Sequence, residues 1–371
     1  MTAVGVRSLV EFFERERRAQ RPLVAAFIIG TEGSTYRKCG ALMLFSSDGE
    51  RLGLLSGGCL EGDLQDHALQ LLKRRERCAV RSYDSRGSDD PVWGLGLGCE
   101  GLMRVLLLKV DEQSGYEPLA SLLQASESRL AAATAIDVAS GELKVCTTAP
   151  TSVSASNGQA ASNDQTESAL EAVCARRLTE GGARTEWIET ARGRREIFSV
   201  AAEHAPTLLV CGAGPDAEPV AEFAARLGWH VTVVDHRSAY IDPTRFPARC
   251  RVVEVDIATL GETINLQHID AAVVMSHHLT ADGRYLAALA ESAIAYVGLL
   301  GPAARRERLA AELGERAAQL RPRLYAPVGL DLGGRTPEAI ALSIVAEIQA
   351  FLNGRRGAPF SATHHGSLSP V

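Results

Sequence analysis

A cysteine directly follows two glycines in the segment 55–64, which has the sequence LSGGCLEGDL. Gly57 and Gly58 allow the backbone to turn tightly or to come close to a bulky partner. Apolar residues then recur on one face over 60–77, which predicts a helix directly after Cys59. A thiol at a helix start lies near the positive end of the helix dipole, which favours the thiolate. Cys59 is therefore a candidate reactive thiol, with a small buried packing residue and a metal ligand as the alternatives.

Two further segments of the N-terminal half carry residues suited to chemistry. In GLGLGCEG (94–101) a thiol again follows glycines, but Cys99 precedes a predicted strand, so the dipole argument does not extend to it. In GTEGSTYRKCGALM (30–43) the cations Arg37 and Lys38 lie in a polar loop between two predicted strands. These cations could hold a phosphate or the edge of a pterin. The alternative is an exposed loop that binds nothing.

The C-terminal half contains the pattern G-x-G-x-x-A, in which Gly212 and Gly214 follow a predicted strand and precede a helix. Asp235 lies at the end of the next predicted strand. In dinucleotide sites the glycines admit the pyrophosphate to the helix N-terminus and the acid binds a ribose hydroxyl. The pattern predicts a nucleotide-binding, Rossmann-like fold with an NAD(P) site. The alternative is that the glycines serve only close packing of helix against strand.

Two adjacent histidines, His277 and His278, follow a predicted strand of the same half. Ligands bind at the carboxyl ends of strands in open α/β sheets, so we expect one of these imidazoles to line the site. Neighbouring side chains on extended backbone point in different directions, which disfavours a metal shared by the two. The alternative is that Ser276 or His278 caps the following helix.

The pattern of strands and helices divides the chain into an N-terminal α+β domain over 1–204 and a Rossmann-like parallel-sheet domain over 205–354. The polar stretch near 147–168 is expected to be a disordered insertion and 355–371 a disordered tail.

Around Cys59, the turn signal Asp48-Gly49 predicts a β-hairpin with arms 41–46 and 51–57, followed by the helix 60–77.

Composition excludes several classes of protein. The chain has 371 residues, a net charge of −6 and a pI near 5.9, which argues against a nucleic-acid binder. The N-terminus lacks the basic start and apolar core of a signal peptide, and no window has the length of a membrane span. Eight scattered cysteines without a C-x-x-C pair indicate reduced thiols in a cytoplasmic protein and disfavour structural zinc.

As an ordered set, several segments resemble the XdhC/CoxI family. Two lie in the N-terminal half and the others in the C-terminal half: GSTYRKCGALMLFSSDGERLGLLSGGCLEGDL, GLGCEG, LLVCGAGPDAEPVAEFAARLGWHVTVVDHR, VVMSHHLTADGRYLAAL, YVGLLGPAARRERL and YAPVGLDLGGRTPEAIALSIVAEI. This chain departs from the family pattern at Ser56 and Glu100, where the family has glycine, and at Tyr36, where it has proline.

The resemblance implies a maturation factor for molybdenum hydroxylases of the xanthine or aldehyde dehydrogenase type. Such a chaperone, rather than an enzyme, binds and protects the molybdenum cofactor (molybdopterin, in mono- or cytosine dinucleotide form). It supports sulfuration with a cysteine desulfurase and inserts the cofactor into the apo-hydroxylase large subunit. The family also implies a homodimer. Cys59 and Cys99 would then contact molybdenum or its sulfur, since a soft thiolate suits such a centre.

An NAD(P)-dependent oxidoreductase is the alternative, with Gly212, Gly214 and Asp235 on the nucleotide and His277 or His278 as acid and base.

Overall fold

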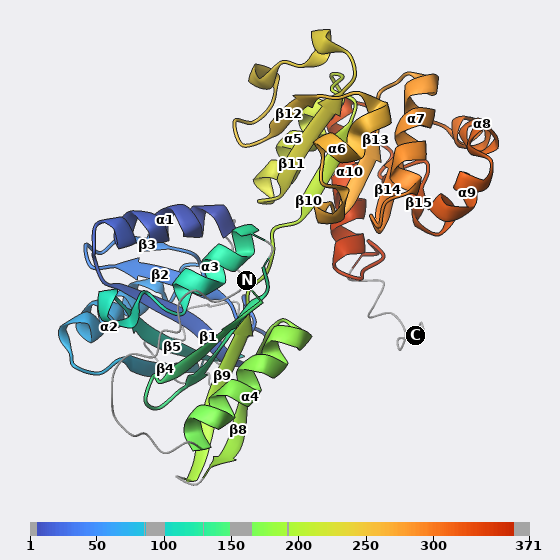
Figure 1. The fold of residues 1–371 in the computed structure, drawn as a ribbon. Coiled ribbons are helices and arrows are strands. Elements are labelled where there is room, and N and C mark those ends of the chain that lie inside the picture. The colour runs from blue at the N-terminus through green and yellow to red at the C-terminus, as the bar shows by residue number, and fades with distance from the viewer. Residues whose placement is uncertain are drawn as a thin grey trace, which may run out of the picture. The chain divides into compact units, whose positions relative to one another are not determined.

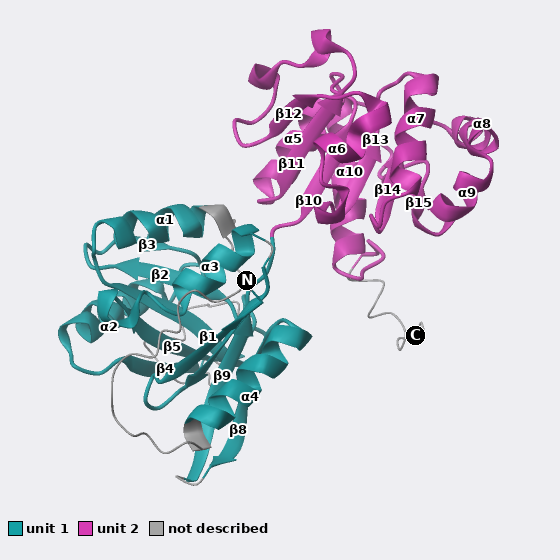
Figure 2. Ribbon diagram, viewed as in Figure 1, with its two compact units in different colours: residues 1–204 teal, residues 205–371 magenta. Residues whose placement is uncertain are grey.

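The computed structural model describes residues 6–84, 86, 101–128, 130–148, 165–190 and 193–359. The chain forms two compact units, residues 1–204 and 205–371, and each is described by itself (Figures 1 and 2). Most of the predicted insertion lies outside the described residues. Its predicted bounds are too wide, because a strand reaches Thr147 and a helix begins at Gln165. Residues 355–359 have no regular secondary structure, and the rest of the predicted tail lies outside the described part.

Unit 1 is the predicted α+β part. Its described strands and helices are β1 (Leu23–Gly33), β2 (Leu42–Ser46), β3 (Arg51–Leu52), β4 (Cys78–Asp84), β5 (Gly101–Val110), β6 (Ala132–Asp137), β7 (Leu143–Thr147), β8 (Ala183–Thr190), β9 (Gly193–Ala201), α1 (Val6–Arg18), α2 (Glu61–Lys73), α3 (Leu119–Ser128) and α4 (Gln165–Glu180). Among the described residues these strands form two antiparallel sheets, of order β3-β2-β1-β5-β4 and β7-β6-β9-β8.

The layers of unit 1 follow from which sheet faces are apolar. One face of the first sheet packs on α2, and its opposite face shares a core with α1, α3 and the second sheet. Phe27 of β1 meets Phe198 of β9 in that shared core, with ring centroids 5.4 Å apart. Helix α4 covers the outer face of the second sheet. Strand β1 is therefore buried on both faces, which explains its continuous apolar sequence.

The predicted hairpin before Cys59 is confirmed, but its second arm is shorter than predicted. Strands β2 and β3 pair in antiparallel register, with Leu44 opposite Leu52. Pairing then stops, and Gly53 has a φ of +113°, a value that L side chains rarely adopt. The following helix also ends early, at Lys73, because the chain turns to an extended conformation at Arg74.

Unit 2 has the predicted Rossmann-like architecture. Its described elements are β10 (Thr207–Cys211), β11 (His230–Asp235), β12 (Arg251–Glu254), β13 (Ala271–Val274), β14 (Tyr296–Leu299), β15 (Leu324–Tyr325), α5 (Ala217–Arg226), α6 (Leu260–Thr263), α7 (Leu279–Ala290), α8 (Ala303–Leu313), α9 (Glu315–Leu320) and α10 (Pro337–Leu352). The sheet is parallel and has the order β12-β11-β10-β13-β14-β15. This is the doubly wound order, with its switch point between β10 and β13.

Both faces of the unit 2 sheet are covered. Helices α5 and α10 pack on one face, and α6 and α7 pack on the other together with Leu309 of α8. The N-cap of α10 is Thr336, whose side chain accepts a hydrogen bond from the Ala339 N–H at 3.3 Å. No helix in the described part of the chain combines the length and the apolar character needed to cross a membrane.

A matched pair of leucines tests where the unit 1 core lies. Leu108 of β5 is fully buried in the core shared by the two sheets, whereas Leu227 at the end of α5 is 51% exposed. We expect Leu108→Ala to lower the free energy of unfolding by about 3 kcal/mol through lost burial and the cavity that remains. Leu227→Ala should change it by less than about 0.5 kcal/mol. Urea unfolding followed by circular dichroism measures both, and equal effects would contradict this description of the core.

Candidate functional site

The segment before α2 folds around the carboxylate of Glu61. This side chain belongs to the first residue of α2 and is only 2% exposed. It accepts hydrogen bonds from the backbone N–H groups of Leu55 at 3.0 Å and Ser56 at 2.8 Å, and from the Ser56 hydroxyl at 2.6 Å. The Leu60 N–H donates to the Ser56 hydroxyl at 2.8 Å and to the Glu61 carboxylate at 3.2 Å. One carboxylate therefore ties both ends of the loop 55–60 together.

These contacts set the protonation of Glu61. Burial works to raise the pKa of the Glu61 carboxyl, but the hydrogen bonds from the Ser56 side chain and from backbone N–H groups outweigh it. The pKa therefore lies below its ordinary value, and the loop is held together by a charged carboxylate at neutral pH.

The closed loop displays Gly57, Gly58 and Cys59 to solvent. The two glycines have φ values of +82° and +114°, which only glycine adopts without strain. A Cβ at Gly58 would meet nothing within 4 Å, so the loop is open at this glycine. Because Cys59 is exposed, the interpretation of this cysteine as a buried packing residue is wrong.

The loop with the predicted cations lies against the cysteine loop. A Cβ added at Gly57 would lie 3.6 Å from the ring of Tyr36, which is itself 53% exposed. The Arg37 guanidinium lies 5.6 Å from the centre of the Tyr36 ring, and Arg37 Nε is buried without a hydrogen-bond partner. Lys38 donates to the Thr35 hydroxyl at 3.2 Å. A thiol, an aromatic ring and a guanidinium therefore lie in adjoining loops.

Gly101, two residues after the second predicted cysteine, lies against Ser34 and Thr35 of the loop that carries the cations. A Cβ at Gly101 would lie 2.6 Å from the Ser34 carbonyl oxygen and 2.7 Å from the Thr35 side chain, so only glycine fits there. Gly101 thus lets β5 begin against the loop of Arg37. Cys99 lies outside the described residues, and its role stays a prediction.

Two residues of this site are missed by reasoning from the sequence. Glu61 is one of several acids at the start of the predicted helix, although its spacing from Ser56 allows a side chain to reach back over the loop. Tyr36 stands out in the sequence only as a departure from the family pattern. Among the described residues, no group of three or more histidine, cysteine or acidic side chains is placed to hold a metal ion.

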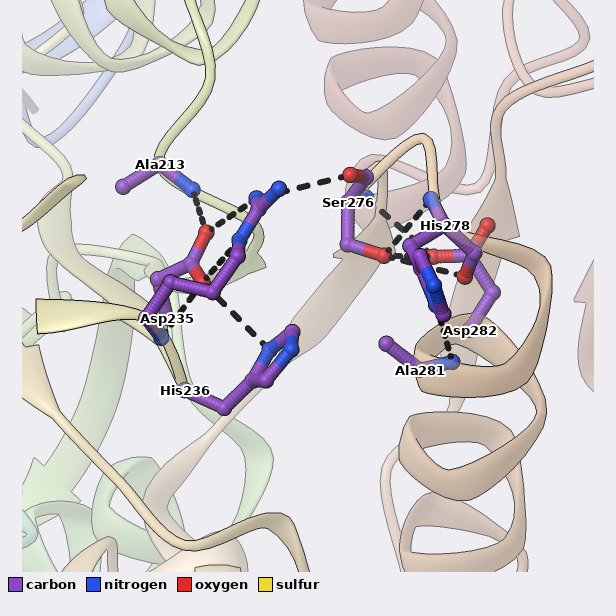
Figure 3. A network of polar contacts seen from close by, with 8 residues as sticks. Ala213, Asp235, His236, Ser276, His278, Ala281 and Asp282 are labelled. Atoms are coloured by element: carbon purple, nitrogen blue, oxygen red, sulfur yellow. Dashed lines mark hydrogen bonds and ion pairs between the residues drawn. The ribbon is translucent and has the colours of Figure 1, made fainter. Parts of the chain in front are cut away.

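Two of the predicted residues of unit 2, Asp235 at the end of β11 and His278 after β13, lie at the carboxyl edge of its sheet (Figure 3). Gly212 has a φ of +120°, and a Cβ there would lie 2.6 Å from Ser276 Cα. This glycine therefore allows β10 and β13 to approach closely, which is a packing role. At Gly214 the nearest atom to an added Cβ is His277 Cδ2, at 3.9 Å.

Asp235 is engaged by its own unit. Its buried carboxylate accepts hydrogen bonds from the Ala213 N–H at 2.9 Å and from the Arg237 side chain at 2.9 and 2.8 Å. Burial works to raise the pKa of Asp235, but the hydrogen bonds from Arg237 and Ala213 outweigh it and the pKa lies below its ordinary value. The Arg237 guanidinium in turn lies 3.8 Å from the centre of the Tyr240 ring. Binding of a ribose by this carboxylate stays a prediction.

The two histidines have different surroundings. His277 has a φ of +59° and its Nε2 lies 3.0 Å from the carboxylate of Asp216, at the start of α5. His278 Nδ1 accepts a hydrogen bond from the Ala281 N–H at 3.3 Å and so caps α7, which is the alternative given for this residue. Whether either imidazole contacts a ligand stays a prediction.

Comparison with known proteins covers both units. The model of the XdhC and CoxI family matches residues 16–84, and that of the XdhC Rossmann domain matches residues 208–348. A protein of Bacillus subtilis (strain 168) that is named as a probable xanthine dehydrogenase subunit is 32% identical over 331 residues, 89% of this chain and 93% of that protein.

Two further relatives span nearly the whole chain. The molybdenum cofactor insertion chaperone PaoD of Escherichia coli (strain K12) is 24% identical, over 92% of this chain and 87% of its own length. A crystal structure of a protein named as a xanthine dehydrogenase from Bacillus halodurans superposes with a TM-score of 0.72 at 29% identity. That superposition covers 95% of this chain and 98% of the other.

Glu61→Gln tests the carboxylate that holds the cysteine loop. The glutamine amide has one neutral oxygen acceptor, whereas the carboxylate has two charged oxygens that both accept hydrogen bonds. We therefore expect the variant to lose about 2 kcal/mol of unfolding free energy at pH 7. Since the folded pKa of Glu61 is lowered, its contribution is present at neutral pH and is lost as the pH falls below its ordinary value of 4.5. Urea unfolding between pH 6 and pH 3 should therefore show a shallower decline for Glu61→Gln than for the wild type.

The control is Asp66→Asn, which removes an exposed acid from the same helix. It should leave the pH profile of the wild type unchanged. Parallel profiles for Glu61→Gln and the wild type would contradict the role given to Glu61.

A second test separates the two glycines of unit 2. We expect Gly212→Ala to destabilise the protein by about 2 kcal/mol or more, because of strain at positive φ and collision with the chain at the end of β13. Gly214→Ala should cost less than about 1 kcal/mol, since a Cβ there has room. Thermal unfolding measures both, and equal losses would contradict the packing role of Gly212.

Proposed function

The chain belongs to the XdhC and CoxI family, and on that premise we propose that it is a maturation factor that carries the molybdenum cofactor to an apo molybdenum hydroxylase of the xanthine dehydrogenase type. In this proposal the cofactor is cargo, and the protein acts as a chaperone rather than as an enzyme. The likeness to the cofactor insertion chaperone PaoD supports it over nearly the whole chain.

One observation carries the proposal: the buried Glu61 carboxylate holds a loop that displays an exposed thiol between glycines and a helix. The Glu61 carboxylate holds this loop without any contribution from the exposed cysteine. A thiolate is a soft ligand and suits molybdenum that carries sulfur and dithiolene ligands. We therefore assign Cys59 to the metal end of the cargo, with Gly57 and Gly58 leaving room for it.

The remaining residues of unit 1 fit the other end of such a cargo. Molybdopterin combines a flat ring system with a phosphate, and the exposed Tyr36 ring lies next to the cations Arg37 and Lys38. We assign these two cations to the phosphate, because guanidinium and ammonium groups form charge-assisted hydrogen bonds with it. Cys99 is proposed as a second thiol at the metal end.

The finer parts of the proposal concern partners and cofactor form. We propose that a cysteine desulfurase supplies the sulfur, that the apo-hydroxylase large subunit receives the cofactor, and that the chain works as a cytoplasmic homodimer. The cargo is molybdopterin or its cytosine dinucleotide. Both forms contain the pterin and its phosphate, so the same residues of unit 1 would bind either form.

The fold of unit 2 supports a second function, that of an NAD(P)-dependent oxidoreductase. Its strand order and its Gly212-x-Gly214 turn are those of dinucleotide-binding proteins. Against it stand Asp235, whose carboxylate is occupied by Arg237 and Ala213, and Asp216, whose negative charge lies where a pyrophosphate would approach. Titration with NADH and NADPH followed by fluorescence tests this function, and Gly214→Ala is the variant that would block the ligand while leaving the fold intact.

Cys59→Ala tests the cofactor proposal. The protein is purified from cells that make the molybdenum cofactor, and bound pterin and molybdenum are measured by fluorescence after oxidation and by mass spectrometry. We expect the wild type to retain both and Cys59→Ala to lose most of the molybdenum, because the soft ligand is gone. Cys250→Ala, which removes a half-buried thiol from unit 2, should behave like the wild type.

Absence of pterin from all three proteins, together with tight NAD(P)H binding and turnover, would overturn the chaperone proposal. Equal molybdenum in Cys59→Ala and the wild type would overturn the role of this cysteine alone.

A further inference from the structure

A second pair of thiols lies in unit 1, apart from the loops described above. Cys146 lies on β7 and is half-buried, whereas Cys174 lies on α4 and is fully buried. Both belong to the small core between α4 and the outer face of the second sheet. They are far apart in sequence, and the fold brings them to one spot.

The contacts of α4 place Cys174 directly over β6 and β7. The Cys174 thiol donates to the Ala133 carbonyl at 3.2 Å and lies 3.4 Å from the Lys144 carbonyl. Ala133 is the register partner of Cys146 across the β6–β7 pair. The backbone around Cys146 is thus the surface on which the Cys174 sulfur rests.

The side chain of Cys146 points toward the same helix. Alternate residues of a strand share a face, and Lys144, two positions earlier, lies 3.7 Å from the carboxylates of Glu167 and Glu171 on α4. Cys146 packs against the core cluster that contains Cys174. Burial, followed by the neighbouring Cys146 side chain, raises the pKa of Cys174. Cys174 is therefore a protonated, solvent-protected thiol beside one that solvent reaches in part.

We propose that Cys146 and Cys174 form a redox-responsive pair that closes an intramolecular disulfide when the protein meets a hydroperoxide. The asymmetry of the two sites assigns the steps, because the half-buried thiol can be reached by a small oxidant and the buried one cannot. Cys146 is the thiol that is oxidised first, and Cys174 is the resolving thiol.

The chemistry balances with the hydroperoxide as the oxidant. The Cys146 sulfur attacks one peroxide oxygen, the O–O bond breaks, and the other oxygen leaves as water or an alcohol. Cys146 is then a sulfenic acid. The Cys174 sulfur attacks the Cys146 sulfur, the S–O bond breaks and water leaves with the Cys174 proton. Two thiols have lost two electrons and two protons, and the peroxide has accepted both.

The disulfide would fasten α4 to β7. It closes the chain between residues 146 and 174, which restricts the unfolded state and so favours the folded one. The second sheet and its covering helix then become a covalently joined layer. The pair lies on a different face of unit 1 from the Cys59 loop, so this response does not depend on the proposed function.

The test uses the full chain, purified with reductant and then freed of it. Hydrogen peroxide is added, remaining thiols are alkylated in denaturant, and the intact mass and a peptide map are measured. We expect two of the eight cysteines to escape the label, a cross-linked peptide that joins Cys146 to Cys174, and a higher urea midpoint that dithiothreitol reverses. Cys146→Ser and Cys174→Ser should each abolish the cross-link, whereas Cys250→Ser should retain it.

The wild-type peptide map decides the matter even if a serine variant folds poorly. A map in which Cys59 is oxidised while Cys146 and Cys174 both carry the label would overturn the proposal, because the oxidant then reached the protein without forming the bond. A disulfide between any other two cysteines would overturn it as well.

Discussion

The buried carboxylate of Glu61 is the interaction on which the candidate site depends. Removing a charged group from water is costly unless hydrogen bonds replace the lost solvation. The loop 55–60 supplies these bonds from its own backbone and from Ser56, so the loop and the carboxylate stabilise each other. Cys59 is therefore not needed to hold the loop in place. The thiol can face solvent because the loop is fixed from within rather than by packing of its cysteine.

The sequence predicted the regular elements better than the loops. The strand predicted after Cys99 is β5, which begins at Gly101. The second hairpin arm was predicted to reach residue 57 because Leu54 and Leu55 extend its apolar run. In the structure the Leu55 N–H is bonded to Glu61 and not to a neighbouring strand. The apolar pattern of a strand cannot show that the Leu55 N–H will be bonded by the side chain of Glu61, which comes later in the chain.

The glycines of unit 2 show a different limit of sequence patterns. Gly212 and Gly214 stand in one motif, yet the first is required by the close approach of the chain after β13 and the second has free space in front of it. Both positions are glycine in the sequence, although the structure requires glycine for close packing only at Gly212. Likewise, the sequence places an acid at the end of β11 but does not show that Arg237, two residues later, folds back on its carboxylate. The spacing of a motif identifies such residues, whereas the structure identifies their hydrogen-bond partners.

The ring of Tyr36 gives the exposed loop two unequal sides. A Cβ at Gly57 would contact the ring at 3.6 Å, whereas a Cβ at Gly58 would contact nothing within 4 Å. The two glycines before Cys59 therefore differ in their surroundings, although both have a positive φ. An aromatic side chain lies beside the first of them and no side chain lies beside the second.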